Sequence, residues 1–141
     1  MIDLAIAATL ALTSASRDAA GWPDRLVLNC SDTATQAVSV LDGTAWTTTL
    51  VPTSTAPYEF TIDIPAGMID TFRGREPARI TATSGYLRIE FNGFSSWDEP
   101  AAAPHVITYV GAPQAREGSL AQLAVSEGHA SMSTGTCRQV G

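Results

Sequence analysis

Apolar and polar residues alternate along most of this chain, and the pattern is clearest in the segment Tyr58–Ile64. A period of two places successive side chains on opposite faces of a strand, so this segment predicts a strand with one apolar and one polar face. The same reasoning predicts about eight short strands in all. They lie in eight segments, residues 25–30, 36–41, 45–51, 58–64, 79–91, 105–110, 122–126 and 129–133, of which 79–91 folds as a hairpin.

Turn residues predict the register of two hairpins. A turn at residues 84–85, Ser-Gly, would pair Ile80 with Ile89 on the inner face and Arg79 with Glu90 on the outer face. An opposite-charge pair directly across two strands stabilises the hairpin slightly. Turn chemistry and side-chain pattern therefore agree on a single register for this segment.

A second Gly-containing turn, at residues 127–128, predicts the last hairpin. It would pair Val125 with Ala130 and Leu123 with Met132, so that all four side chains share one face. The two strands that it joins would be neighbours in the sheet.

The Asp-Gly pair at residues 42–43 predicts a third tight hairpin. A two-residue turn there would place Trp46 on the face opposite Val38 and Val40. Trp46 is therefore either exposed, or the loop is longer than two residues.

Segments 68–77, 92–104 and 112–118 contain Gly, Pro or no alternation and are predicted as loops. The body has no amphipathic helical pattern. These features predict an all-β fold, either a small antiparallel barrel or a two-sheet sandwich. Pairing of the first strand with the last would close a barrel and bring Cys30 close to Cys137.

The first residues form a separate unit. Residues 1–12 are mostly apolar and small residues follow, which is typical of a signal peptide and too short for a membrane span. Asp3 and the absence of Lys or Arg before this stretch count against that interpretation. An N-terminal helix packed on the domain is the alternative. We expect a signal peptide at residues 1–20 and one β-domain at residues 21–141.

The two cysteines, Cys30 and Cys137, lie near opposite ends of that domain. They form no CxxC motif, and with only two histidines in the chain they make no recognisable metal site. In an exported protein they predict one disulfide, whereas a cytosolic protein would keep two reduced thiols.

The charge of the chain restricts its partners. The formal net charge is −6, and all eight basic residues are arginines that form no cluster. An acidic surface repels phosphate backbones, so we expect no nucleic-acid partner. We also expect no membrane span once the leader is removed.

Catalytic motifs are missing from the sequence. His105 and His129 are the only histidines, and neither lies in a known catalytic pattern. The segment 92–104 holds Phe94 and Trp97 beside Asp98 and Glu99. Long loops with exposed aromatic residues suit recognition of a protein or a glycan, so these four residues are the predicted binding site. The alternative is that the two aromatic rings fold back and cover the end of the barrel.

The layout of the chain resembles that of some small periplasmic lysozyme inhibitors. The shared features are a leader, a cysteine in the first strand, a Gly-x-Cys segment near the end and the Ser-Gly-Tyr piece at residues 84–86. The Trp-x-Lys-Gly segment of those inhibitors is absent, and the sequence identifies no family.

These observations predict a non-catalytic exported β-domain, periplasmic or secreted, that binds another protein or a glycan in the bacterial envelope without a cofactor. An inhibitor-like or accessory role would fit. One alternative is a structural or assembly component of a virion or appendage, which would self-associate. Another is a hydrolase that acts on cell-wall glycans through Asp98 or Glu99.

Overall fold

Ten antiparallel strands make up the computed structural model, which describes residues 20–71, 74–93 and 103–140. None of these residues forms a long apolar helix of the kind that crosses a membrane. The strands are β1 (Arg25–Asp32), β2 (Thr35–Asp42), β3 (Ala45–Pro52), β4 (Tyr58–Asp63), β5 (Met68–Thr71), β6 (Gly74–Ala82), β7 (Tyr86–Gly93), β8 (Ala103–Val110), β9 (Glu117–Ser126) and β10 (His129–Val140).

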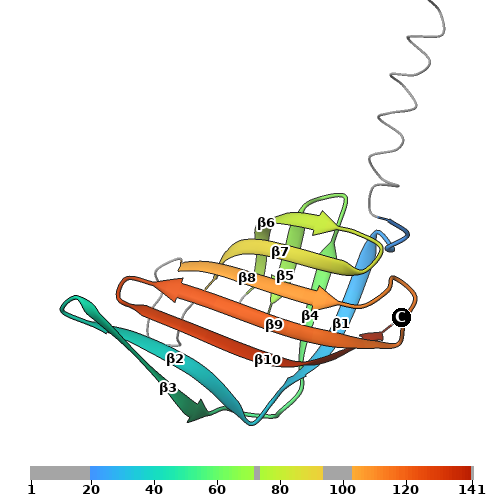
Figure 1. Ribbon diagram of the computed structural model, residues 1–141. Coiled ribbons are helices and arrows are strands. Elements are labelled where there is room, and N and C mark those ends of the chain that lie inside the picture. Colours follow the sequence, from blue (N-terminus) through green and yellow to red (C-terminus); the bar gives the residue numbers. More distant parts are fainter. Residues whose placement is uncertain (1–19, 72–73, 94–102, 141) are drawn as a thin grey trace, which may run out of the picture.

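Eight of these strands form a closed barrel, in the order β1-β4-β5-β6-β7-β8-β9-β10 with β10 paired back to β1 (Figure 1). From β4 to β10 each strand pairs with the next one along the chain. This settles the choice between barrel and sandwich. The first and last strands, β1 and β10, pair with each other and close the barrel, which is one of the two architectures that the sequence allowed.

The remaining two strands, β2 and β3, form a hairpin that leaves the barrel beside β10 (Figure 1). The C-terminal half of β10 pairs with β1, and its N-terminal half, residues 129–132, pairs with β2. Between the two strands, the Thr33 N–H donates to the carbonyl oxygen of Thr134 at 2.8 Å. The same edge of β10 thus pairs with the projecting hairpin over its N-terminal half and closes the barrel over its C-terminal half.

The barrel interior is filled by every second side chain of its strands, as the period of a strand requires. The buried apolar residues are Trp22, Leu26, Leu28, Cys30, Phe60, Ile62, Ile69, Leu87, Ile89, Phe91, Ile107, Tyr109, Leu120, Ala124 and Cys137. Because the described core contains no fully buried polar residue, hydrophobic burial is its main stabilising contribution.

Trp22 covers the end of the barrel where β1 begins. Its Nε1–H donates to the carbonyl oxygen of Thr83 at 2.6 Å, which satisfies the one polar atom of the ring. The indole also meets the ring of Tyr109 edge-on, with centroids 6.0 Å apart.

One glycine permits the approach of β1 to β10. A Cβ atom on Gly135 would lie 2.3 Å from the carbonyl oxygen of Ser31, which is closer than any real side chain allows. Gly135 pairs with Asp32, the last residue of β1, where the chain turns away into the hairpin. Only a residue without a side chain fits between the strands at this point.

Two predicted registers are confirmed. Ile80 pairs with Ile89, and Arg79 pairs with Glu90 and forms an ion pair with an N–O distance of 3.9 Å. The turn at residues 127–128 pairs β9 with β10 in the predicted register as well. In both cases a Gly-containing turn and the alternation pointed to the same pairing.

The prediction of a loop at residues 68–77 is wrong, because β5 and the start of β6 lie there. Gly74 and Pro77 were treated as strand breakers. In the structure both sit at the ends of the β5–β6 ladder, where Gly74 pairs with Thr71 and Pro77 with Met68. A proline at a ladder end costs no hydrogen bond of the sheet interior.

Two smaller predictions also need correction. The predicted loop at 112–118 is shorter, because β9 begins at Glu117. The hairpin turn predicted at residues 42–43 lies at Gly43-Thr44, so that Leu41 pairs with Trp46. Moving the turn by one position leaves every side chain on its predicted face. Trp46 is 54% exposed, as expected for a two-residue turn.

The disulfide between Cys30 and Cys137 is confirmed, and it joins directly paired residues of β1 and β10. The bridge spans a sequence separation of 107 residues. Both cysteines are almost fully buried, so the bridge lies inside the closing seam of the barrel.

We expect loss of the bridge to destabilise the protein strongly. Loop-closure entropy gives about 4–5 kcal/mol for a loop of this length. The double variant Cys30→Ala/Cys137→Ala should therefore lose about 3–5 kcal/mol in urea unfolding. Reduced wild-type protein is the matched control, because it keeps both sulfur atoms in the core. A loss below about 1 kcal/mol in the reduced protein would contradict the role of the bridge.

We also expect Gly135→Ala to destabilise the barrel by about 1–3 kcal/mol, because the added methyl group overlaps the backbone of β1. Gly85→Ala is the control, since a Cβ at Gly85 meets nothing within 4 Å. Its effect should stay within about 0.5 kcal/mol. Equal effects of the two substitutions on the urea midpoint would show that the approach at Gly135 is not tight.

Candidate functional site

Polar side chains line the barrel interior at the end where the hairpin leaves. His105 Nε2 donates to Gln122 Oε1 at 3.2 Å, and Gln122 Nε2 donates to the Tyr58 hydroxyl oxygen at 2.5 Å. The Tyr58 hydroxyl in turn donates to Asp32. These four residues from β8, β9, β4 and β1 form one chain of hydrogen bonds across the barrel.

The environment of this chain shifts two pKa values. Burial, the hydrogen bond to Asp32 and the charge of that carboxylate raise the pKa of Tyr58 far above its usual value, and the bond from Gln122 offsets this only in part. Burial lowers the pKa of His105, against a smaller opposite effect of its bond with Gln122. At neutral pH both groups are therefore uncharged.

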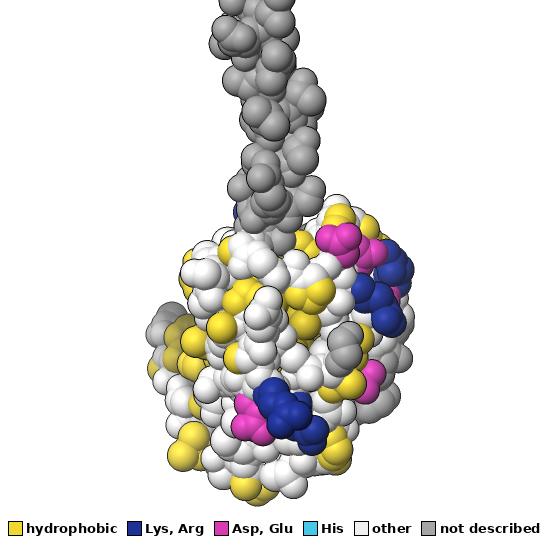
Figure 2. Space-filling view, turned by 90° about the vertical axis from the view of Figure 1, so that its right-hand side faces the viewer, with side chains coloured by type: hydrophobic (Ala, Val, Ile, Leu, Met, Phe, Trp, Pro, Cys, Tyr) yellow, Lys and Arg dark blue, Asp and Glu magenta, His cyan; other side chains and the backbone are white. Residues whose placement is uncertain are grey.

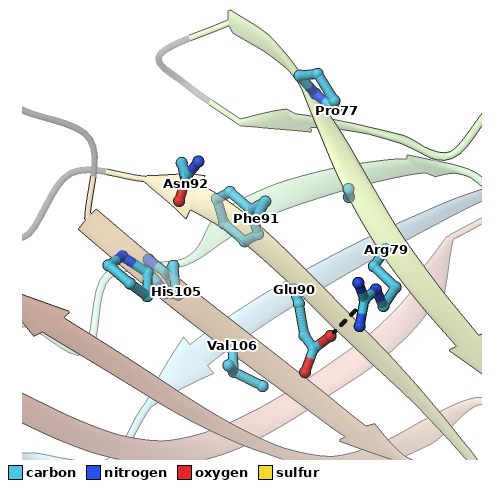
Figure 3. A pocket seen from close by; sticks show the side chains of 9 residues that line it. Pro77, Arg79, Glu90, Phe91, Asn92, His105 and Val106 are labelled. Atoms are coloured by element: carbon cyan, nitrogen blue, oxygen red, sulfur yellow. Dashed lines mark ion pairs between the residues drawn. The ribbon is translucent and has the colours of Figure 1, made fainter.

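Beside His105 the barrel wall opens into a shallow depression of about 530 Å³ (Figure 3). The last β6–β7 pair is Ala78 with Phe91, and beyond it Pro77 and Asn92 lie apart on the two strands. The rings of Phe91 and His105 stack with centroids 4.8 Å apart. Their stacked rings form part of the lining, while Arg79 and Glu90 pair on the outer side.

The surroundings fix the state of both rings. Tyr58 keeps its proton at neutral pH, and the imidazole of His105 is packed flat against Phe91. Within residues 20–71, 74–93 and 103–140, no three His, Cys, Asp or Glu side chains gather in a way that would hold a metal ion. The hydrogen-bond chain satisfies polar groups at the open end of the barrel.

The predicted binding residues Phe94, Trp97, Asp98 and Glu99 lie outside the described residues. The structure fixes only the two ends of their segment, at Gly93 in β7 and Ala103 in β8, which are paired neighbours. Both ends belong to the same open end of the barrel as His105. The two alternatives for this loop, and the hydrolase hypothesis built on its acids, remain predictions.

Outside the barrel wall, sequence reasoning missed an exposed apolar surface. Five strands each contribute one residue to a continuous cross-strand ladder, here called the outer apolar row. Its members are Leu50 of β3, Ala37 of β2, Met132 of β10, Leu123 of β9 and Val106 of β8. Leu50 is 75% exposed and Met132 52%. With strands about 4.8 Å apart, the row is about 19 Å long.

Further exposed apolar residues flank this row. Val125 lies next to it on β9, and Leu41 and Trp46 lie together on the same outer face of the hairpin. The polar pair Ser39–Thr48 separates Leu41 and Trp46 from the row. Single exposed apolar residues are common on proteins, whereas an extended group of them is typical of an interaction site. The outer apolar row and these three neighbours therefore form the best candidate for a binding surface.

Charged side chains border the row at one end, where Glu90 of β7 pairs with Val106 and forms ion pairs with Arg79 and Arg88. Figure 2 shows one face of the molecule on which arginine and acidic side chains lie next to each other in small separate groups. Among the described residues, guanidinium nitrogens of Arg75 lie 3.2 Å from a carboxylate oxygen of Asp63 and 3.6 Å from one of Asp70. These two carboxylates balance the charge of Arg75.

The sequence contained a signal for the outer surface. The pairing of Leu123 with Met132 on one face was predicted, but alternation does not say which face of a strand is inside. In β10 the inner face carries Ser131 and Ser133, both half-buried, whereas Met132 points outward. The last hairpin carries small polar residues on one face and large apolar residues on the other. This pattern was the available indication that its apolar face is exposed.

We expect stability to fall at mildly acidic pH because of His105. Its folded-state pKa is lower than the unfolded value of about 6.5, so the unfolded chain binds more protons as the pH falls. The stabilisation is complete above about pH 7 and is lost as the pH falls through about 6.5 towards the folded-state pKa. Urea unfolding at about pH 7.5 and about pH 5.5 should show a smaller decrease for His105→Gln than for wild type.

His129→Gln is the matched control for this experiment, since it removes the other histidine of the chain. It should retain the wild-type decrease. Equal decreases for wild type and His105→Gln would rule out His105 as the source.

Neither protein-family models nor curated proteins give a match to this sequence. Among solved structures, the fold is similar to part of a mutant of transferrin binding protein B, a vaccine antigen from Haemophilus parasuis. The sequence identity is 11% and the TM-score 0.45, over 87% of this chain and 28% of that chain. The chain thus corresponds to less than a third of that protein, and the likeness assigns neither a family nor a function to it.

Proposed function

We propose that this protein is a non-catalytic β-barrel domain that binds another protein outside the cytoplasm, in the bacterial envelope or after secretion. The observation that carries the proposal is the outer apolar row. Its exposed aliphatic side chains lie in one ladder over five strands, and burying them against a partner would be favourable. A glycan would find few polar side chains along this row.

Rigid placement supports the same conclusion. The row is built on paired strands rather than on loops, so little backbone freedom would be lost on binding. Met132 and Leu123 form its centre and are held by the β9–β10 ladder. Flat sheet faces with apolar centres are suited to standard protein–protein interfaces.

In this proposal the loop between Gly93 and Ala103 contributes to the same surface. Val106 of the outer apolar row lies three residues after Ala103 on β8, so the loop begins and ends close to the row. Phe94 and Trp97 would add aromatic anchors, and Asp98 and Glu99 a charged rim. Such a combination is typical of interface centres and their surroundings.

The disulfide supports the proposed compartment. Buried structural disulfides persist in oxidising environments, that is, in the periplasm or outside the cell, and are rare in the cytosol. Export by a signal peptide at residues 1–20 is part of the proposal. The intact mass of the native protein, before and after reduction, measures both properties.

We expect substitutions in the proposed surface to weaken partner capture without unfolding the barrel. Purified wild type, Leu123→Glu, Trp97→Ala and Thr81→Glu would each be used as bait with extracytoplasmic extract from the producing bacterium. Thr81 is the matched control because it is exposed on β6, away from the outer apolar row. Leu123→Glu and Trp97→Ala should each retain at least about tenfold less of the captured protein than Thr81→Glu, equivalent to about 1.4 kcal/mol.

Thermal unfolding of the same variants decides between binding and packing. All four proteins should unfold within about 4 °C of one another. A much lower unfolding temperature for Trp97→Ala would mean that Trp97 is part of the core. Equal capture by all four baits would contradict the proposed surface.

A further inference from the structure

Strand β3 ends the sheet, and no described residue pairs with its outer edge (Figure 1). Free edges usually carry charged residues, internal prolines or bulges that prevent further pairing. The strand Ala45–Pro52 has no charged residue, and its only proline is the last residue. Its ladder with β2 runs through eight consecutive pairs without a bulge. The edge is therefore open to another strand.

Hydrogen bonds identify the backbone groups available on this edge. The N–H of Thr53 donates to the carbonyl oxygen of Ala34 at 2.9 Å, and that of Leu41 donates to Gly128 on the opposite side of β2. In an antiparallel ladder the direction alternates along each strand. Residues 45, 47, 49 and 51 of β3 therefore bond to β2, whereas Trp46, Thr48 and Leu50 direct their N–H and C=O groups outward.

We propose that this edge pairs with the same edge of a second copy of the chain, about a twofold axis at Thr48. Two identical edges related by a twofold axis are antiparallel by symmetry. Placing Thr48 opposite its counterpart sets Trp46 opposite Leu50 of the second copy, and Leu50 opposite Trp46. All three outward-directed residues then form hydrogen-bonded pairs, with six backbone hydrogen bonds between the copies.

The side chains favour this register. Trp46 and Leu50 are 54% and 75% exposed, and both lie on the outer face. In the dimer each Trp46 would pack directly across from a Leu50, and aromatic and aliphatic cross-strand pairs stabilise a sheet, as do Thr–Thr pairs. The two most exposed large apolar residues of β3 would thus cover each other.

Neighbouring registers are less favourable. If one copy were shifted by one residue, the free N–H and C=O groups of Thr48 would face Thr47 or Thr49 of the other copy. The backbone groups of those residues are already bonded to β2, so no hydrogen bond could form there. The next allowed shift in one direction places Trp46 opposite Pro52, which has no N–H to donate. The shift in the other direction moves Leu50 opposite Thr44 in the turn and leaves it without an apolar partner. Only the proposed register both pairs all the outward-directed N–H and C=O groups of Trp46, Thr48 and Leu50 and places apolar side chains opposite each other.

Charge permits self-pairing at this place. Each copy has a formal net charge of −6, but strand β3 carries no charged side chain, so no like charges meet at the contact. Repulsion between the copies is therefore long-range and screened by salt. A dimer of this kind should strengthen with ionic strength. The inference shares Leu50 and Trp46 with the proposed partner surface, but it rests on the backbone edge of β3. The Thr48 variants test that edge without changing any member of the outer apolar row.

Sedimentation of the oxidised full-length chain at increasing concentration tests the proposal. Wild type should show a monomer–dimer equilibrium in the micromolar range at physiological salt, and Thr48→Pro should weaken it at least about tenfold by removing the central N–H. Thr48→Lys should do the same by placing two like charges opposite each other. Thr48→Val is the matched control: it also loses the 2.7 Å hydroxyl contact with Ser39, but keeps the N–H and should dimerise like wild type.

A cysteine at the twofold axis tests the register. Paired residues in the proposed dimer have Cα atoms about 5.5 Å apart, within reach of a disulfide. Thr48→Cys should therefore give a covalent dimer on mild oxidation. Ser39→Cys is the control, because it loses the same hydroxyl contact but lies one strand further from the edge, and it should stay uncrosslinked.

Three outcomes would overturn the proposal. Wild type could remain monomeric into the millimolar range, which would show that the edge of β3 does not pair with a second copy. Thr48→Pro and Thr48→Lys could both dimerise like Thr48→Val. Ser39→Cys could crosslink as readily as Thr48→Cys, which would place the contact elsewhere. Equal partner capture by all four baits, together with the dimer as proposed, would overturn only the proposed function.

Discussion

Pairing of β1 with the C-terminal half of β10 is the contact on which the rest of the structure depends. It converts a sequential meander into a closed barrel and turns one face of eight strands inward. The contact is reinforced by a disulfide between opposite residues and requires a glycine at position 135 where the backbones meet. Without this seam, β1 and β10 would each present a free edge, and the core would be open on one side.

Because β10 is longer than β1, the same seam also creates the exposed features of the molecule. The part of β10 that extends beyond β1 pairs with β2, and the sheet continues out of the barrel instead of ending. Along this extension the inner face of β10 carries small polar residues, and the apolar residues Met132 and Leu50 lie exposed on the outer face. The polar residues at the adjoining barrel end are joined through Tyr58 and Gln122 into one hydrogen-bond chain.

The fold was largely predictable, because alternation and turn residues constrain each other locally. The hairpin around residues 84–85 shows this, since Ile80 and Ile89 could pair inside in only one register. The strands around Gly74 were not predicted, because breaker residues at a ladder end and in a loop look alike in a sequence. The outer surface was missed since Met132 alternates with polar residues that face inward. The predicted loop residues 94–99 are not among those that the structure describes.

The position of β2 and β3 in the chain has a consequence for how such a domain can change over time. Strands β1 and β4 are direct neighbours in the barrel, and Cys30 at the end of β1 pairs with Tyr58 at the start of β4. The hairpin is therefore inserted in the chain between two neighbouring barrel strands, β1 and β4. The other eight strands make a complete up-and-down barrel without it. A change in the length or sequence of the hairpin would therefore leave the pairing of the eight barrel strands intact, as expected for a segment inserted at the surface of a domain.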